Sequence, residues 1–262
     1  MKKTAIVTGA SRGIGRETAL LLSQNGYEVF DLSRSGESKD GIKTVKTDLC
    51  SEEDIIRAFD EIFKERDRLD LLVNNAGFGI SGAVEFTSTA DAKRLFDVNF
   101  FAPFMCSREA VKYLRNSDNP HIVNISSAAA IFPLPFQAFY SASKAAVHSL
   151  SMALSGELLP FGIRVNTVMP GDSKTTFTAK REKSFEGEEL YGERIVRSIS
   201  SMEKDEQGGF SPKLVAETIV KIAESDKTGG IHIVGGKYKV FAAVSNLLPE
   251  RLKNRLIFKM YG

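Results

Sequence analysis

The sequence lacks tryptophan and is poor in cysteine and histidine, with two and three residues of these types among 262. Cys50 and Cys106 match no metal-ligand spacing, and no histidine lies in an HExxH pattern. We therefore expect two free thiols and no metal site. An excess of charge is also absent, because 35 basic residues stand against 33 acidic ones. That balance argues against a nucleic-acid-binding protein, which needs a concentrated basic face.

Long apolar runs are missing as well. The run at residues 5–7 is too short for a signal sequence, and no stretch approaches the ~18 apolar residues of a membrane span. We therefore expect a soluble cytoplasmic protein. What the sequence does have is 42% hydrophobic residues, enough for one large core in a chain of this length.

Strand-like and helix-like segments alternate along the chain. The expected strands are residues 4–7, 27–32, a short segment around 45, 69–73, 121–125, 163–168 and 231–234. The main expected helices follow the first strand up to residue 25 and then cover 51–63, 89–115 with a bend or break at Pro103, 139–159 and 212–223. Parallel strands need crossover connections, usually helical. The pattern predicts one α/β domain over residues 1–236, a Rossmann-like doubly wound parallel sheet of about seven strands with helices on both faces.

Two segments fall outside this alternation. Residues 171–209 are polar, charged and weakly periodic, which predicts a mobile loop with short helices that acts as a substrate lid. Residues 237–262 form an amphipathic tail that Pro249 is expected to split into two helices. Such a segment can lie on an anionic membrane, cover the core or join subunits, and we favour packing over membrane contact. The tail combines Val244, Leu247, Leu248, Leu252, Leu256, Ile257 and Met260 with Arg251, Lys253, Arg255 and Lys259.

The first expected strand leads into a glycine-rich stretch, Thr8-Gly9-Ala10-Ser11-Arg12-Gly13-Ile14-Gly15. Glycines permit a tight turn and close approach of the backbone to a pyrophosphate, and the following helix N-terminus offers free N–H groups. In open α/β sheets, ligands bind beyond the carboxyl ends of the strands. The position between a strand and a helix therefore favours a dinucleotide site over a purely structural turn.

Several motifs, in the same order along residues 3–234, resemble those of the classical short-chain dehydrogenase/reductase family. They are Thr8-Gly9-x-x-x-Gly13-x-Gly15, Asn74-Asn75-Ala76-Gly77, Asn99, Ser127, Tyr140-Ser141-Ala142-Ser143-Lys144 and Pro170-Gly171. The resemblance implies an oxidoreductase with a nicotinamide cofactor. It implies these cofactor-binding residues: Gly9, Ser11, Arg12, Gly13, Ile14, Gly15, Ser33, Arg34, Asp48, Leu49, Asn75, Ala76, Gly77, Tyr140, Lys144, Pro170, Gly171 and Thr175.

The tip of the second expected strand bears on the choice of nucleotide. An acidic residue there would bind the ribose 2′-hydroxyl of NAD, whereas a cation would bind the 2′-phosphate of NADP. By comparison with the family the tip falls at Ser33-Arg34, and Arg12 could join Arg34 at a phosphate. Asp31 is the alternative NAD-type acid, and it shares a strand face with Ser33. We expect NADP(H), with NAD(H) as the alternative.

The expected catalytic residues are Asn99, Ser127, Tyr140 and Lys144. Tyrosine, with a pKa of about 10, is a poor base at neutral pH. Lys144 lies one helical turn beyond Tyr140, where its charge would favour the tyrosinate. By resemblance, Lys144 also holds the ribose hydroxyls and Asn99 holds a water for proton relay. The spacing in that family selects Ser127 over Ser126 as the hydrogen-bond donor to the substrate carbonyl.

The apolar residues beside the expected cleft could line a hydrophobic substrate pocket or fill the core. They are Phe78, Ile80, Ile131, Phe132, Pro133, Leu134, Pro135 and Phe136. The leading hypothesis is an NADP-dependent reductase or dehydrogenase of a carbonyl or secondary alcohol that works as a homo-oligomer, a dimer or tetramer. The alternatives are an NAD-dependent alcohol dehydrogenase of the same family and a non-catalytic dinucleotide sensor on the same fold.

Overall fold

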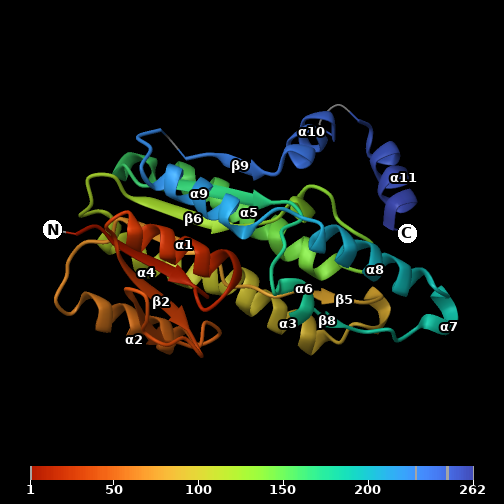
Figure 1. The fold of residues 1–262 in the computed structure, drawn as a ribbon, viewed down its shortest axis with the longest axis horizontal. Helices are drawn as coiled ribbons and strands as arrows, with labels where there is room; N and C mark the ends of the chain where they lie inside the picture. The colour runs from red at the N-terminus through yellow and green to blue at the C-terminus, as the bar shows by residue number, and fades with distance from the viewer. Residues whose placement is uncertain (1, 228, 246–247, 262) are drawn as a thin grey trace.

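A seven-stranded parallel sheet forms the centre of the chain in this computed structural model, which describes residues 2–227, 229–245 and 248–261 (Figure 1). The strand order is β3-β2-β1-β4-β6-β7-β9. The strands are β1 (Thr4–Thr8), β2 (Glu28–Ser33), β3 (Ile42–Lys46), β4 (Leu71–Asn74), β6 (His121–Ile125), β7 (Arg164–Pro170) and β9 (Ile231–Val234). All seven predicted strands are present, and the order reverses direction between β1 and β4, which confirms the doubly wound fold.

Helices cover both faces of the sheet. On one face, α1 (Gly13–Gln24) and α9 (Pro212–Ala223) bury Leu22 and Ile219 against Ala5 and Val7 of β1. On the other face lie α2 (Glu52–Phe63), α4 (Ala102–Leu114) and α5 (Ala138–Leu158). Ile6, between Ala5 and Val7, belongs to this second cluster. Successive side chains of a strand point to opposite faces, so the middle of β1 is buried on both sides of the sheet, and its three central residues are all apolar.

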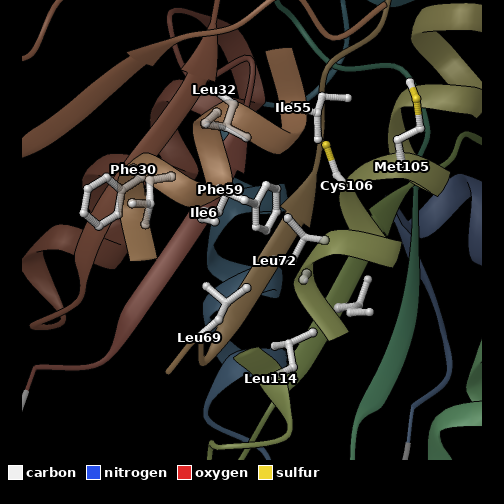
Figure 2. Packing of buried hydrophobic residues seen from close by; sticks show 14 of the residues in the cluster. Ile6, Phe30, Leu32, Ile55, Phe59, Leu69, Leu72, Met105, Cys106 and Leu114 are labelled. Atoms are coloured by element: carbon white, nitrogen blue, oxygen red, sulfur yellow. The ribbon is translucent and has the colours of Figure 1, made fainter. Parts of the chain in front are cut away.

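The second cluster is the larger core (Figure 2). Ser51 accepts the N–H of Asp54 and so caps α2, the start that the sequence predicted. The helix then buries Ile55 and Phe59 at helical spacing. From α4, Cys106 packs into the same cluster, and both Cys106 and the exposed Cys50 are free thiols, as predicted.

The helix expected over residues 89–115 is interrupted one turn before Pro103. It consists of α3 (Thr89–Phe96), a π-helical turn (Asp97–Phe101) and α4. Pro103 has no N–H to donate to the carbonyl four residues earlier, and it lies in the first turn of α4, where none is needed. The N–H of Ala102 reaches the carbonyl of Asp97 instead, five residues back. The wider turn places Asn99 inside the molecule, fully buried.

The segment 171–209 contains more regular structure than predicted. It forms α6 (Phe177–Lys180), β8 (Glu182–Lys183), α7 (Glu188–Tyr191) and the 14-residue helix α8 (Arg194–Gln207). β8 pairs with β5 (Ile80–Ser81) in a second, two-stranded sheet. Ile195, Ile199 and Met202 of α8 are buried, so the expectation of a loop with only short helices is wrong for α8. The charged outer face of α8 hid this periodicity in the sequence.

The tail forms two helices, α10 (Gly236–Ser245) and α11 (Glu250–Tyr261), and α11 begins directly after Pro249 (Figure 1). Leu247 lies outside the described residues. Among the described residues of α11 none is buried, and Tyr261 alone packs at the edge of a core cluster. The tail therefore covers less of the core than expected. None of the helices described here has the length and apolar character needed to cross a membrane.

Candidate active site

A cavity of about 1110 Å³ lies at the carboxyl ends of the strands. Loops that follow β1, β2, β4, β6 and β7 all contribute to it, which is the arrangement expected of an open α/β sheet. Most of the predicted site residues line this cavity: Gly9, Ser11, Arg12, Gly13, Ile14, Ser33, Arg34, Asp48, Leu49, Asn75, Ala76, Gly77, Ser127, Tyr140, Lys144, Pro170, Gly171 and Thr175. Gly15 and Asn99 are not among the lining residues. Each lies behind residues that line the cavity and supports their positions.

The glycine-rich loop has the form of an anion cradle. Gly13 has a positive φ of 56°, which side chains rarely tolerate. At Gly15 a Cβ atom would lie 2.5 Å from the Gly9 carbonyl oxygen, so α1 can approach the loop this closely only with glycine there. The first turn of α1 contains no acidic residue, and the side chain of Arg12 does not cap it. Its N–H groups therefore remain available to a phosphate in the cavity.

Two side chains hold the ends of β1 and β4 together beneath this loop. The hydroxyl of Thr8 accepts the N–H groups of Asn75 and Ala76, each at 3.0 Å. The amide of Asn75 donates back to the carbonyl of Thr8 at 2.9 Å. These bonds join strands that are 67 residues apart in sequence and fix the cofactor-side wall of the cavity.

Asp31, the alternative NAD-type acid, is turned away from the cavity. Its carboxylate is 2% exposed and accepts the N–H of Ala10 at 2.8 Å and the hydroxyl of Ser33 at 2.7 Å. Burial raises its pKa above the usual range despite these bonds. Arg12 and Arg34 line the cavity instead, and neither makes an ion pair within the described part of the chain. This end of the cavity therefore holds these two arginines, with Asp48 as a further charged lining residue.

Ser127 and Tyr140 meet at the other end of the cavity. Ser127 caps a short turn by accepting the N–H of Ala129 at 3.1 Å, and its hydroxyl is hydrogen-bonded to Tyr140. Burial raises the pKa of Tyr140 to about 12, and the bond from Ser127 partly opposes that rise. The neighbouring Ser126 is engaged elsewhere, because its hydroxyl donates to the carbonyl of Lys144 at 2.7 Å. The geometry thus separates a structural serine from one that faces the tyrosine.

Lys144 extends beside the tyrosine from the next turn of α5. Its Nζ atom lies 5.9 Å from the centre of the Tyr140 ring and donates to the carbonyl of Ile125 at 2.9 Å. The side chain is buried without a carboxylate partner, and this burial lowers its pKa to about 8. A buried lysine that no acid neutralises is available to ligand hydroxyl groups.

Asn99 supports this arrangement from behind. Its amide donates to the Phe78 carbonyl at 3.0 Å and to the Ser143 hydroxyl at 3.1 Å, and it accepts the Phe78 N–H at 3.1 Å. The side chain therefore ties the loop after Gly77 to α5. All of its polar atoms are used in these bonds, so contact with a substrate would have to come from other groups.

One wall of the cavity was not predicted from the sequence. Tyr238, Phe241 and Val244 of α10 line it, with Leu256, Ile257 and Met260 of α11. The ring of Tyr238 lies so close to Gly171 that a Cβ atom there would overlap it, and its hydroxyl donates to Asp172. Amphipathic spacing predicted the tail helices, but nothing local in the sequence indicates where such helices dock.

The apolar residues that the sequence placed beside the cleft divide between two roles. Phe78, Phe132 and Leu134 line the cavity, whereas Phe136 is buried in a third core cluster with α8. The ring of Phe177, which the sequence did not single out, lies 5.5 Å from that of Tyr140. The lining of the cavity thus includes several aromatic and aliphatic side chains, as well as the hydroxyl groups of Ser127 and Tyr140 and the charged Glu206.

Comparisons with known proteins agree with this geometry. Residues 3–186 match the family described as short chain dehydrogenase. A 3-ketodihydrosphingosine reductase of Bacteroides thetaiotaomicron is 35% identical over 251 residues, which cover 94% of this chain and 93% of that protein. A short-chain dehydrogenase from Streptomyces avermitilis superposes with a TM-score of 0.83 at 28% identity, covering 94% of this chain and 93% of the other. ElxO with NADP bound superposes with a TM-score of 0.76 at 30% identity, covering 92% of this chain and 100% of that one.

Proposed function

The chain belongs to the short-chain dehydrogenase/reductase family of oxidoreductases, and on that premise we propose that it is an NADP(H)-dependent reductase of hydrophobic ketones. The observation that carries the proposal is the convergence of Ser127, Tyr140 and Lys144 on one cavity with the glycine-rich loop. Each of these features alone is common in proteins. Together, at the carboxyl edge of a doubly wound sheet, they provide a dinucleotide cradle and a proton donor.

The residues fit a nicotinamide dinucleotide. The free N–H groups at the start of α1 match a pyrophosphate, and the buried Lys144 matches ribose hydroxyls. When bound, the cofactor supplies the hydride that reduces the substrate carbon. All other parts of the chemistry fall to side chains of this chain.

Tyr140 is the proposed general acid. Because its pKa is raised to about 12, the phenol stays protonated at neutral pH and can donate its proton to the developing alkoxide. Ser127 donates a hydrogen bond toward the same oxygen and stabilises its charge. Lys144, with a pKa near 8, is mostly protonated at neutral pH and favours the tyrosinate left behind. Proton relay through Asn99, and closure of residues 171–209 as a lid, remain predictions.

The preference for NADP(H) rests on two arginines that line the cavity. Arg12 and Arg34 face the cavity there, while Asp31 is committed to Ala10 and Ser33. An arginine fork binds a phosphate well, and a 2′-phosphate is what distinguishes NADP from NAD. ElxO, a relative of known structure, has NADP bound.

The preference for a ketone on an apolar molecule rests on the other end of the cavity. Phe132, Leu134 and Phe177 line the cavity, and the ring of Phe177 lies 5.5 Å from that of Tyr140. The relative from Bacteroides thetaiotaomicron is named as a reductase of a keto compound, in line with reduction here. The division into domains at residue 236, a cytoplasmic location and a homo-oligomeric state also remain predictions.

A titration with NADPH and with NADH, followed by turnover assays, tests the proposal. We expect tighter binding of NADPH, read from the enhanced fluorescence of the bound nucleotide. We then expect nicotinamide oxidation with ketones whose rate constant kcat/KM rises with the length of an attached alkyl chain. Binding without turnover across a panel of ketones and aldehydes would indicate a dinucleotide sensor, and absence of binding would overturn the proposal.

A further inference from the structure

The tail contributes part of the rim of the cavity. Phe241 and Val244 of α10 line the cavity, as do Leu256 and Met260 of α11. These four side chains are also 40–48% exposed to solvent. The same apolar side chains therefore border the cavity and face the solvent outside it. Figure 1 shows the two helices at the C-terminal end of the chain, beyond the end of β9.

The exposed surface of α11 includes two stripes. Leu252, Leu256 and Met260 follow one another at four-residue spacing, and so do Arg251, Arg255 and Lys259. Residues four apart lie one above the other on a helix, so an apolar stripe runs beside a basic one. All six side chains are exposed.

α11 contacts the rest of the molecule along the side that faces away from these two stripes. The hydroxyl of Tyr261 donates to Asp205 of α8 at 2.7 Å, and Ile257 and Lys253 lie on the same side as Tyr261. Phe258 is 57% exposed. The contacts with α8 hold α11 in place without covering either outer stripe.

Positive charge is concentrated in this part of the chain. Residues 237–262 contain six lysines and arginines and one acidic residue, a formal charge of +5, whereas the whole chain carries only +2. Arg251, Arg255 and Lys259 form no ion pair within the described residues. A partner for this surface must therefore be both apolar and negatively charged.

We propose that the tail docks on the surface of an anionic lipid bilayer, so that the cavity mouth opens toward the acyl chains. Parallel apolar and basic stripes are the pattern by which helices lie in a membrane interface. A symmetric contact between two copies of the chain would instead place one +5 tail against another, with like charges opposed. The charge thus favours a bilayer over a second copy.

Docking at a bilayer also specifies the substrate more closely, and this part rests on the proposed function. A ketone with a long alkyl chain could pass from the lipid phase along Leu256 and Met260 into the cavity. Its carbonyl group would then reach Tyr140 while the chain remained among the tail residues. We infer a membrane-resident, long-chain ketone as the substrate class.

Vesicle sedimentation with the full chain tests the docking without any assay of activity. The vesicles are phosphatidylcholine alone or phosphatidylcholine mixed with phosphatidylglycerol. We expect binding to the mixed vesicles, weakened by added salt. Simultaneous Arg251→Glu, Arg255→Glu and Lys259→Glu substitutions should lower the partition coefficient at least about tenfold. None of these three residues lines the cavity.

A charge-matched control is the triple variant Lys46→Glu, Lys64→Glu and Lys221→Glu, which alters exposed lysines away from the tail. It should bind the mixed vesicles like the unaltered chain. Equal losses in the two triple variants, or no binding by the unaltered chain, would overturn the proposal. A tail variant that changes the sedimentation velocity from oligomer to monomer without affecting vesicle binding would also overturn it, in favour of a subunit contact. Thermal unfolding followed by circular dichroism verifies that both variants fold.

Discussion

Replacing Tyr140 with phenylalanine is expected to lower kcat for ketone reduction by about 10²–10⁴-fold, the range that general acid catalysis contributes. The change removes the one phenol oxygen bonded to Ser127 and leaves the ring, which packs 5.5 Å from that of Phe177. The shape of the cavity should therefore persist. Because the cradle for the dinucleotide lies at the glycine-rich loop, the Kd for NADPH should stay within about threefold of the original value.

Tyr113→Phe is the matched control for this substitution. Tyr113 lies on α4, where its ring stacks on Phe63 at 3.6 Å, and it does not line the cavity. It should leave kcat unchanged. Steady-state kinetics with nucleotide fluorescence on the same preparations separate catalysis from binding. A Tyr140→Phe variant that reduces ketones at nearly the original rate would contradict the assignment of the proton donor.

Replacing Arg34 with alanine is expected to raise the Kd for NADPH by about 10–100-fold and the Kd for NADH by less than about threefold. A hydrogen bond to a charged group contributes roughly 1.5–3 kcal/mol, and each 1.4 kcal/mol corresponds to a factor of ten in Kd. Arg34 lines the cavity and has no ion-pair partner among the described residues, so the substitution breaks no salt bridge of the free chain. The loss should fall on the nucleotide that carries the 2′-phosphate.

Arg57→Ala is the control for Arg34→Ala. Arg57 is exposed on α2 and pairs with Asp54 at 3.0 Å, away from the cavity. It should change neither affinity. Arg12→Ala should resemble Arg34→Ala, since both side chains face the cavity near the glycine-rich loop. If Arg34→Ala lost affinity for NADPH and NADH equally, Arg34 would not recognise the 2′-phosphate. NAD(H) would then again be a candidate cofactor.

The sheet and the cofactor edge could be predicted because their signals are local. Strands buried on both faces contain short continuous apolar runs, as in residues 5–7, and the glycines of the first loop are imposed by backbone geometry. The signal from Tyr140 and Lys144 is also local, because the two residues lie one helical turn apart. Such features can be recognised from the sequence before any tertiary contact is known.

The remaining features depend on tertiary contacts. Nothing within residues 28–33 distinguishes Asp31 as a ligand from Asp31 as a buried acceptor, and its bond to Ala10 crosses to another strand end. The buried face of α8 was obscured by charged neighbours on the opposite face. The docking of Tyr238 on Gly171 joins residues 67 apart, and no periodicity indicates such a contact. For this reason the sequence did not predict that the tail helices line the cavity.

We propose that this chain transfers a hydride from NADPH to a ketone with Tyr140 as the proton donor. The most direct measurement uses NADPH that carries deuterium at the transferred position of the nicotinamide, incubated with the protein and a long-chain ketone. Mass spectrometry of the product should show one deuterium on the new carbinol carbon, formed by the unaltered chain and nearly absent with Tyr140→Phe. An alcohol without deuterium, or no alcohol at all when NADPH is tightly bound, would contradict the account.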